Sequence, residues 1–74
     1  MNILLIGGGG REHSIAEALS KSSKINELHC IPGNAGIEKI ASCHNYDISN
    51  QQEILNFCEN NNIDIIFIGP EIPL

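Results

Sequence analysis

Four consecutive glycines, residues 7–10, separate a short apolar segment from a segment with helical periodicity. The apolar run at residues 3–6 is uninterrupted, which is typical of a strand buried on both faces of a parallel sheet. Across residues 12–22, apolar side chains recur at the i, i+3, i+4 spacing of an amphipathic helix. A strand, a glycine loop and a helix in this order predict the first unit of an α/β fold.

The remaining chain continues this alternation. Ser49 is interpreted as the N-cap of a further helix, with Gln52 completing a capping box, and the asparagines at 60–62 predict its end. Strands that alternate with helices predict a small open parallel sheet with flanking helices, in which the order 3-2-1-4 makes the first and last strands neighbours. The further elements expected along the chain are residues 28–31 (strand), 37–41 (helical turn), 45–48 (strand), 49–59 (helix) and 63–68 (strand).

Length and charge narrow the classes of function. The 74 residues are expected to form one domain, residues 1–74, since domains usually contain at least about 50 residues. Nine Asp and Glu against four Lys and Arg leave no basic patch, so nucleic acid is not an expected partner. No apolar run approaches the roughly 20 residues that span a bilayer, and no signal peptide is recognisable. We therefore expect no membrane association.

The cysteines are odd in number and widely spaced, at Cys30, Cys43 and Cys58. Without a C-x-x-C pair they are interpreted as reduced thiols, which indicates a cytoplasmic protein. A metal site is not expected, because His29 and Cys30 are neighbours in a strand and point to opposite faces. We expect buried thiols and surface imidazoles, including His44, which follows Cys43.

The glycine loop is the strongest candidate for a binding site. Backbone N–H groups at a helix N-terminus attract anions, although a tight turn that only lets helix and strand pack closely remains an alternative. The dinucleotide fingerprint G-x-G-x-x-G fails, because its third glycine falls on Glu12 or on His13. The P-loop fails as well, since no Gly-Lys pair occurs. A simple sugar phosphate therefore fits better than NAD.

Two further segments are expected at the same edge of the sheet. Residues 32–36 (Pro-Gly-Asn-Ala-Gly) end the second strand, and Asn34 could donate to a phosphate or a hydroxyl group. Glu71 follows the last strand and could accept hydrogen bonds from sugar hydroxyls or from an amine. An ordinary turn and a solvated carboxylate are the respective alternatives. His13 is interpreted as a helix-surface or anion-facing imidazole, and no catalytic residue is predicted.

Three motifs in this order resemble the phosphoribosylamine–glycine ligases, also called glycinamide ribonucleotide synthetases. They are residues 6–13 (Ile-Gly-Gly-Gly-Gly-Arg-Glu-His), residues 32–36 and, after Ile63-Asp64, residues 69–74 (Gly-Pro-Glu-Ile-Pro-Leu). The resemblance covers essentially the whole chain. It implies a Rossmann-like pre-ATP-grasp N-terminal domain.

The resemblance also implies a function. The family consists of cytosolic enzymes of purine (IMP) biosynthesis that join glycine to 5-phosphoribosylamine, using ATP with Mg²⁺ or Mn²⁺. Glycine is activated as an acyl phosphate, which the amine then attacks. The substrate-binding residues carried over are Gly8, Gly9, Gly10 and Arg11 for the ribose phosphate, Asn34 and Glu71 for the sugar-amine side, and Glu12 for the ribose.

The family's enzymes are several times longer than this chain, and their ATP and metal sites lie in an ATP-grasp domain. We therefore expect the chain to continue beyond Leu74 and to work with the remaining domains of the same enzyme. The 74 residues alone are expected to be catalytically inactive. Two alternatives remain: a stand-alone Rossmann-like nucleotide- or NAD-binding module, and a non-catalytic interaction domain with an exposed apolar patch.

Overall fold

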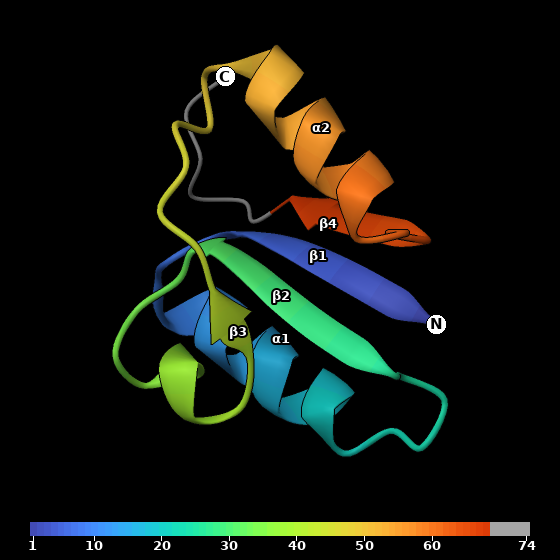
Figure 1. The fold of residues 1–74 in the computed structure, drawn as a ribbon. Helices are drawn as coiled ribbons and strands as arrows, with labels where there is room; N and C mark the ends of the chain where they lie inside the picture. Colours follow the sequence, from blue (N-terminus) through green and yellow to red (C-terminus); the bar gives the residue numbers. More distant parts are fainter. Residues whose placement is uncertain (69–74) are drawn as a thin grey trace.

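The computed structural model describes residues 1–68, which form a four-stranded parallel sheet with a helix on each face (Figure 1). The strand order is β3-β2-β1-β4, the order under which the first and last strands are neighbours, and the predicted fold class is confirmed. The elements are β1 (Asn2–Gly7), α1 (Gly10–Ser20), β2 (Glu27–Pro32), the 3₁₀ turn η1 (Ile37–Lys39), β3 (Ser42–Cys43), α2 (Gln51–Asn60) and β4 (Ile65–Ile68).

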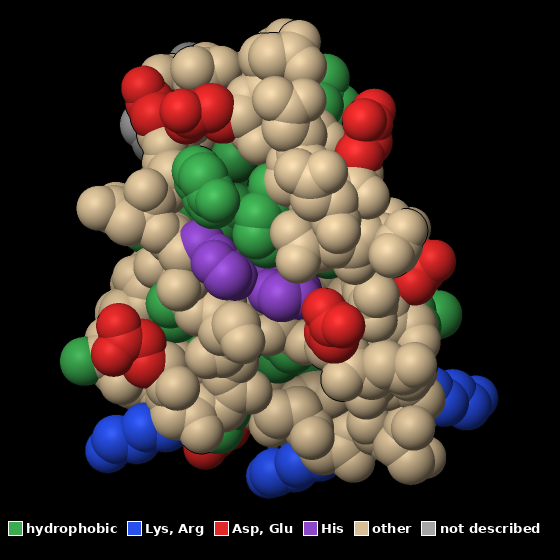
Figure 2. All heavy atoms as spheres, in the orientation of Figure 1, with side chains coloured by type: hydrophobic (Ala, Val, Ile, Leu, Met, Phe, Trp, Pro, Cys, Tyr) green, Lys and Arg blue, Asp and Glu red, His purple; other side chains and the backbone are tan. Residues whose placement is uncertain are grey.

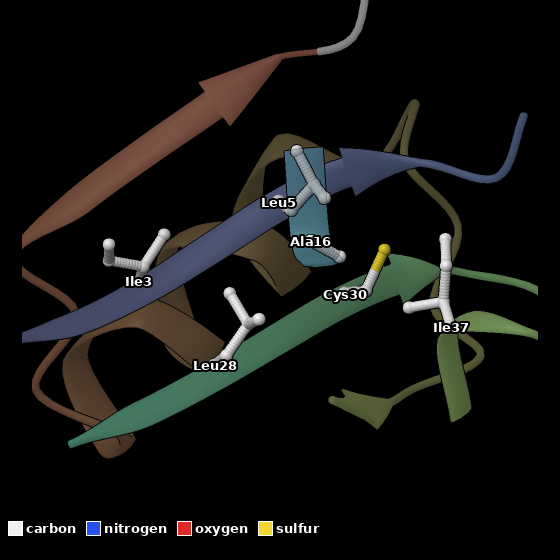
Figure 3. Close-up of a cluster of buried hydrophobic side chains, with 6 residues drawn as sticks. All are labelled: Ile3, Leu5, Ala16, Leu28, Cys30 and Ile37. Atoms are coloured by element: carbon white, nitrogen blue, oxygen red, sulfur yellow. The ribbon is translucent and has the colours of Figure 1, made fainter. Parts of the chain in front are cut away.

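Strand β1 is the centre of the fold and is buried on both faces, as its uninterrupted apolar run predicts. Side chains alternate across a strand, so Ile3 and Leu5 face α1 while Leu4 and Ile6 face α2. Figure 3 shows the α1-side core, and its buried members are Ile3, Leu5, Ala16, Leu28, Cys30 and Ile37. The buried residues on the opposite face are Leu4, Ile6, Ile31 and Phe57.

The third strand lies earlier in the chain than predicted. It comprises Ser42–Cys43, and residues 45–48 form no strand. The expected strand does not form there because Tyr46 and Ile48 are both exposed, so no buried face selects a sheet register. Asp47 instead accepts hydrogen bonds from the backbone N–H and the hydroxyl group of Ser49, which closes a local turn.

The ends of both helices differ from the predictions by one or two residues. Helix α1 begins at Gly10 rather than at residue 12, so the last glycine of the run already belongs to the helix. The N-cap of α2 is Asn50 rather than Ser49, because the Ser49 hydroxyl is bonded to Asp47. The end of α2 is as predicted, since Asn62 adopts a left-handed conformation with φ of 53°.

Strand β4 pairs with β1 alone and forms an apolar patch on the surface. Its four side chains are Ile65, Ile66, Phe67 and Ile68, and all are at least 38% exposed. Such a patch is what the interaction-domain alternative requires, but nothing in residues 1–68 shows what covers it. No helix in this part of the chain is both long enough and apolar enough to cross a membrane.

Candidate functional site

The candidate site lies where β1 and β2 end. Gly7 pairs with Pro32 in the parallel register, so the glycine loop (residues 7–10) and the second loop (residues 33–36) leave the sheet side by side. The Gly33 N–H donates to the Gly7 carbonyl at 3.1 Å, and Asn34 Nδ2 donates to the Gly8 carbonyl at 2.8 Å. Two of the segments predicted to share one edge are therefore joined directly.

The close approach of these loops explains two of their glycines. A Cβ on Gly8 would lie 2.7 Å from the Gly33 carbonyl oxygen, which is backbone and cannot move aside easily. Gly33 has φ of +75°, and a Cβ there would overlap the Sγ atom of Cys43. Only glycine satisfies both conditions without strain.

Helix α1 points its N-terminus toward the glycine loop. Its N-cap is Gly9, which is extended with φ of −91° and offers no side chain to accept from the first N–H groups. Gly10 and Arg11 form the first helical positions, and both are exposed. Orphan N–H groups and the partial positive charge of the helix end therefore face outward at this point. This arrangement is suited to an anion such as a phosphate monoester.

Asn34 occupies the expected edge, but its side chain is engaged within the protein. Nδ2 bonds to the Gly8 carbonyl, and Oδ1 accepts the N–H of Ile37 at 2.9 Å. The amide thus holds the second loop against the glycine loop and at the same time starts the turn at η1. In the described structure it positions the loop, and direct contact with a sugar or an amine stays a prediction.

Glu12 lies behind the glycine loop rather than on its surface. Its side chain is 1% exposed and packs over the Cα atom of Gly7, and its Oε2 has no hydrogen-bond partner. Gly7 has φ of +141°, and a Cβ on Gly7 would overlap the Glu12 carboxyl group. A ribose contact through Glu12 stays a prediction. Arg11, the preceding residue, is exposed and is far more accessible to a ligand.

His13 completes the first turn of α1 and lies against the second loop. A Cβ on Gly36 would come within 2.8 Å of His13 Cε1, so the imidazole packs against Gly36. This contact joins α1 to the loop that contains Asn34. Glu71, and with it the third motif, lies outside the described residues.

Cys30 is buried below the loops, as expected for the thiols, but sequence reasoning missed the hydrogen bond that it makes. Cys30 Sγ donates to the Gly7 carbonyl at 3.2 Å, and Cys30 stands opposite Cys43 in the register of β2 and β3. Burial raises the pKa of Cys30 to about 11, and Cys43 and Glu12 add to the increase. The thiol is therefore a neutral donor at physiological pH. Its apolar setting in the sequence gave no sign of this bond.

The prediction of surface imidazoles is wrong for His29. Its side chain is buried on the α2 side of the sheet, whereas that of Cys30 belongs to the α1-side core. The predicted division of these two neighbours between opposite faces is confirmed. His29 is satisfied by hydrogen bonds to Glu27 and His44, which are 2 and 15 residues away.

Among residues 1–68, no three His, Cys, Asp or Glu side chains come together in a way that could hold a metal ion. The loops provide backbone N–H groups, which suit a single phosphate better than a metal-bound triphosphate.

Comparison with known proteins gives one consistent result. The family model described as "Phosphoribosylglycinamide synthetase, N domain" matches residues 1–74. Phosphoribosylamine–glycine ligases from Caldanaerobacter subterraneus and Clostridium acetobutylicum are 45% and 42% identical over all of this chain, which covers 18% of each relative. The crystal structure of the Thermotoga maritima ligase aligns with a TM-score of 0.66 at 31% identity, covering 96% of this chain and 16% of that one.

Proposed function

Because this chain belongs to the phosphoribosylglycinamide synthetase N-domain family, we propose that it binds the substrate phosphate in an ATP-dependent ligase. The reaction proposed is the joining of glycine to 5-phosphoribosylamine in purine (IMP) biosynthesis, in the cytosol. The chain spans about 18% of the length of the curated relatives that it matches. ATP with Mg²⁺ or Mn²⁺, which activates the glycine carboxylate, is assigned to other domains of the same enzyme.

The observation that carries this proposal is the exposed N-terminus of α1 beside two interlocked loops. The N–H groups of Gly8, Gly9, Gly10 and Arg11 would hold the ribose phosphate, and the Arg11 guanidinium would add a mobile positive charge. Asn34 keeps the second loop at the correct distance. The chain's own contribution is to bind and orient the sugar phosphate, so that its amine is presented to the activated glycine.

The position of Glu12 argues against the dinucleotide-binding alternative. In the dinucleotide fingerprint the third glycine lets the helix approach the strand closely. Here the Glu12 side chain fills that space beside Gly7, and its carboxylate would stand near a bound pyrophosphate. A monophosphate held at the outer end of the loop avoids this conflict.

A kinetic experiment on the ligase that contains this chain tests the proposal. Gly8→Ala places a methyl group against the Gly33 carbonyl and should separate the loops. We expect KM for phosphoribosylamine to rise about tenfold or more, as for the loss of one or two charge-assisted hydrogen bonds, while KM for ATP and for glycine stays unchanged. Ser20→Ala, at the far end of α1, is the control. An equal increase in all three KM values would contradict the proposal.

A further inference from the structure

A second group of interacting polar side chains lies on the α2 side of the sheet, away from the glycine loop. His29 Nε2 lies 2.8 Å from Glu27 Oε1, and His29 Nδ1 lies 2.9 Å from His44 Nε2. Figure 2 shows histidine side chains on this face, next to hydrophobic and acidic side chains. The three residues thus form one chain of hydrogen bonds from β2 to the segment that follows β3.

The carboxylate at one end of this series of hydrogen bonds determines which ring nitrogens carry a hydrogen. The Glu27 carboxylate can only accept, so His29 Nε2 carries a hydrogen. A neutral His29 then has a bare Nδ1, and the hydrogen in the contact between the rings must come from His44 Nε2. The geometry therefore assigns a tautomer to each ring, and it places the free lone pair of the chain on His44 Nδ1.

Aromatic packing holds the two rings in place. The Phe57 ring of α2 lies 5.3 Å from the His29 ring and 4.8 Å from the His44 ring, between centroids, and Tyr46 lies 6.2 Å from His44. Within residues 1–68, the titratable groups in this cluster are Glu27 on β2, Tyr46 on the segment after β3 and Cys58 on α2. Glu27 is the only acid that bonds to either ring there.

We propose that His29 and His44 form a pH-dependent contact that holds segment 44–46 on β2 and releases it in acid. The first proton added to the pair leaves the bond intact, because one ring still donates to the other. The second proton puts N–H groups on both facing nitrogens, and the rings must then separate. Cys43, which packs beneath the second loop, immediately precedes this segment.

Burial, followed by the nearby His29, lowers the pKa of His44 below its usual 6.5. The folded protein therefore binds a proton at His44 less readily than the unfolded chain does. The stabilisation linked to His44 is fully present above pH 6.5 and is lost as the pH falls from about 6.5 toward its lowered pKa. Release is thus expected below neutral pH.

Histidine ring and backbone NMR of the labelled protein tests this inference. At pH 7.5 we expect an unprotonated Nδ1 on His29 and a protonated Nε2 on His44. On acidification the amide signals of residues 44–46 should move together, with a midpoint below pH 6.5, because the pKa of His44 is lowered from that value. A protonated Nδ1 on neutral His29, or amides of residues 44–46 that titrate with a midpoint at or above pH 6.5, would overturn the proposal.

Two variants separate the proton switch from simple packing. His44→Gln keeps an N–H donor toward His29 Nδ1 but cannot titrate, so the acid transition of segment 44–46 should disappear while its neutral-pH spectrum is retained. His13→Gln, on α1, should leave that transition unchanged. A transition that persists in His44→Gln would contradict the inference. If His44→Gln does not fold, the tautomers measured in the unmodified protein still decide.

Discussion

The carboxyl group of Glu12 occupies the space beside Gly7 in which any other residue would place its Cβ atom. Five residues apart in sequence, the two positions meet because the chain reverses from β1 into α1 within three residues. The glutamate side chain packs behind the outer loop, and glycine is the only residue that fits against it. This contact distinguishes the loop from a dinucleotide-binding turn, in which the backbone of the helix approaches the strand closely at this point.

Gly7→Ala should be strongly destabilising. The new methyl group would overlap Glu12, and a φ of +141° is strained for any L-residue. Overpacking and backbone strain together predict a loss of about 2–4 kcal/mol in the free energy of unfolding. Chemical denaturation measures this change. Gly10→Ala is the matched control, because a Cβ on Gly10 meets nothing within 4 Å, and it should be neutral or stabilising by up to about 1 kcal/mol.

Substitutions of Asn34 should affect stability and phosphate binding differently. Asn34→Ala removes the bonds to Gly8 and Ile37, which predicts a loss of about 1–3 kcal/mol in unfolding free energy. Asn34→Asp keeps the acceptor for the Ile37 N–H but adds a negative charge beside the anion site. Its second carboxylate oxygen would face the Gly8 carbonyl oxygen, so we expect Asn34→Asp to be destabilised as well and to be the weaker binder of sugar phosphates of the two variants. Denaturation and isothermal titration calorimetry measure these two effects, and wild-type affinity in Asn34→Asp would contradict the account.

The N-cap of α2 gives a prediction with a neighbouring control. Asn50 Oδ1 accepts the Glu53 N–H at 3.2 Å, whereas the Ser49 hydroxyl is bonded to Asp47. Asn50→Ala should therefore lower the unfolding free energy by about 1 kcal/mol. Ser49→Ala should have a smaller effect, because it leaves the helix end intact. Thermal unfolding of both variants decides, and the reverse ranking would show that the predicted capping box exists in solution.

The buried thiol of Cys30 predicts a dependence of stability on alkaline pH. Burial raises its pKa from 9.0 to about 11 in the folded protein, so the unfolded chain loses this proton more readily. The associated stability is present below pH 9 and is lost as the pH rises from about 9 to about 11. Denaturation curves across this range should show a steeper decline for the wild type than for Cys30→Ala. Parallel declines would contradict the assignment.

The sheet and the first loop were predictable because their signals are local. The apolar run at residues 3–6 predicted a strand buried on both faces, and glycines beside a helix start predicted an exposed helix N-terminus. The parallel arrangement of the strands followed from their alternation with helices. These predictions depend on the spacing of apolar residues and on the conformational freedom of glycine, and both can be read from a short segment of the sequence.

The wrong or missed predictions have two physical causes. Some side chains are held by partners that are distant in the sequence, and in one case two neighbouring residues suit the same role almost equally well. Ser49 and Asn50 are both good N-cap residues. Because the Ser49 hydroxyl donates a hydrogen bond to Asp47, Asn50 is the residue that caps the helix. The bonds that bury His29 depend on a partner 15 residues away. Similarly, the roles of Asn34 and Cys30 require the second loop to lie against the first, and nothing in their local sequence indicates the carbonyl groups to which they donate.

An NMR titration of backbone amides with ribose 5-phosphate tests most directly the claim that the N–H groups of the glycine loop hold a sugar phosphate. The account predicts shifts confined to residues 8–11 and to the second loop, with no comparable shifts when NADH is added instead. Sodium sulfate at equal ionic strength is the control for a general salt effect. Shifts of the same residues with NADH alone, or no response to ribose 5-phosphate in a protein that binds it by calorimetry, would contradict the account.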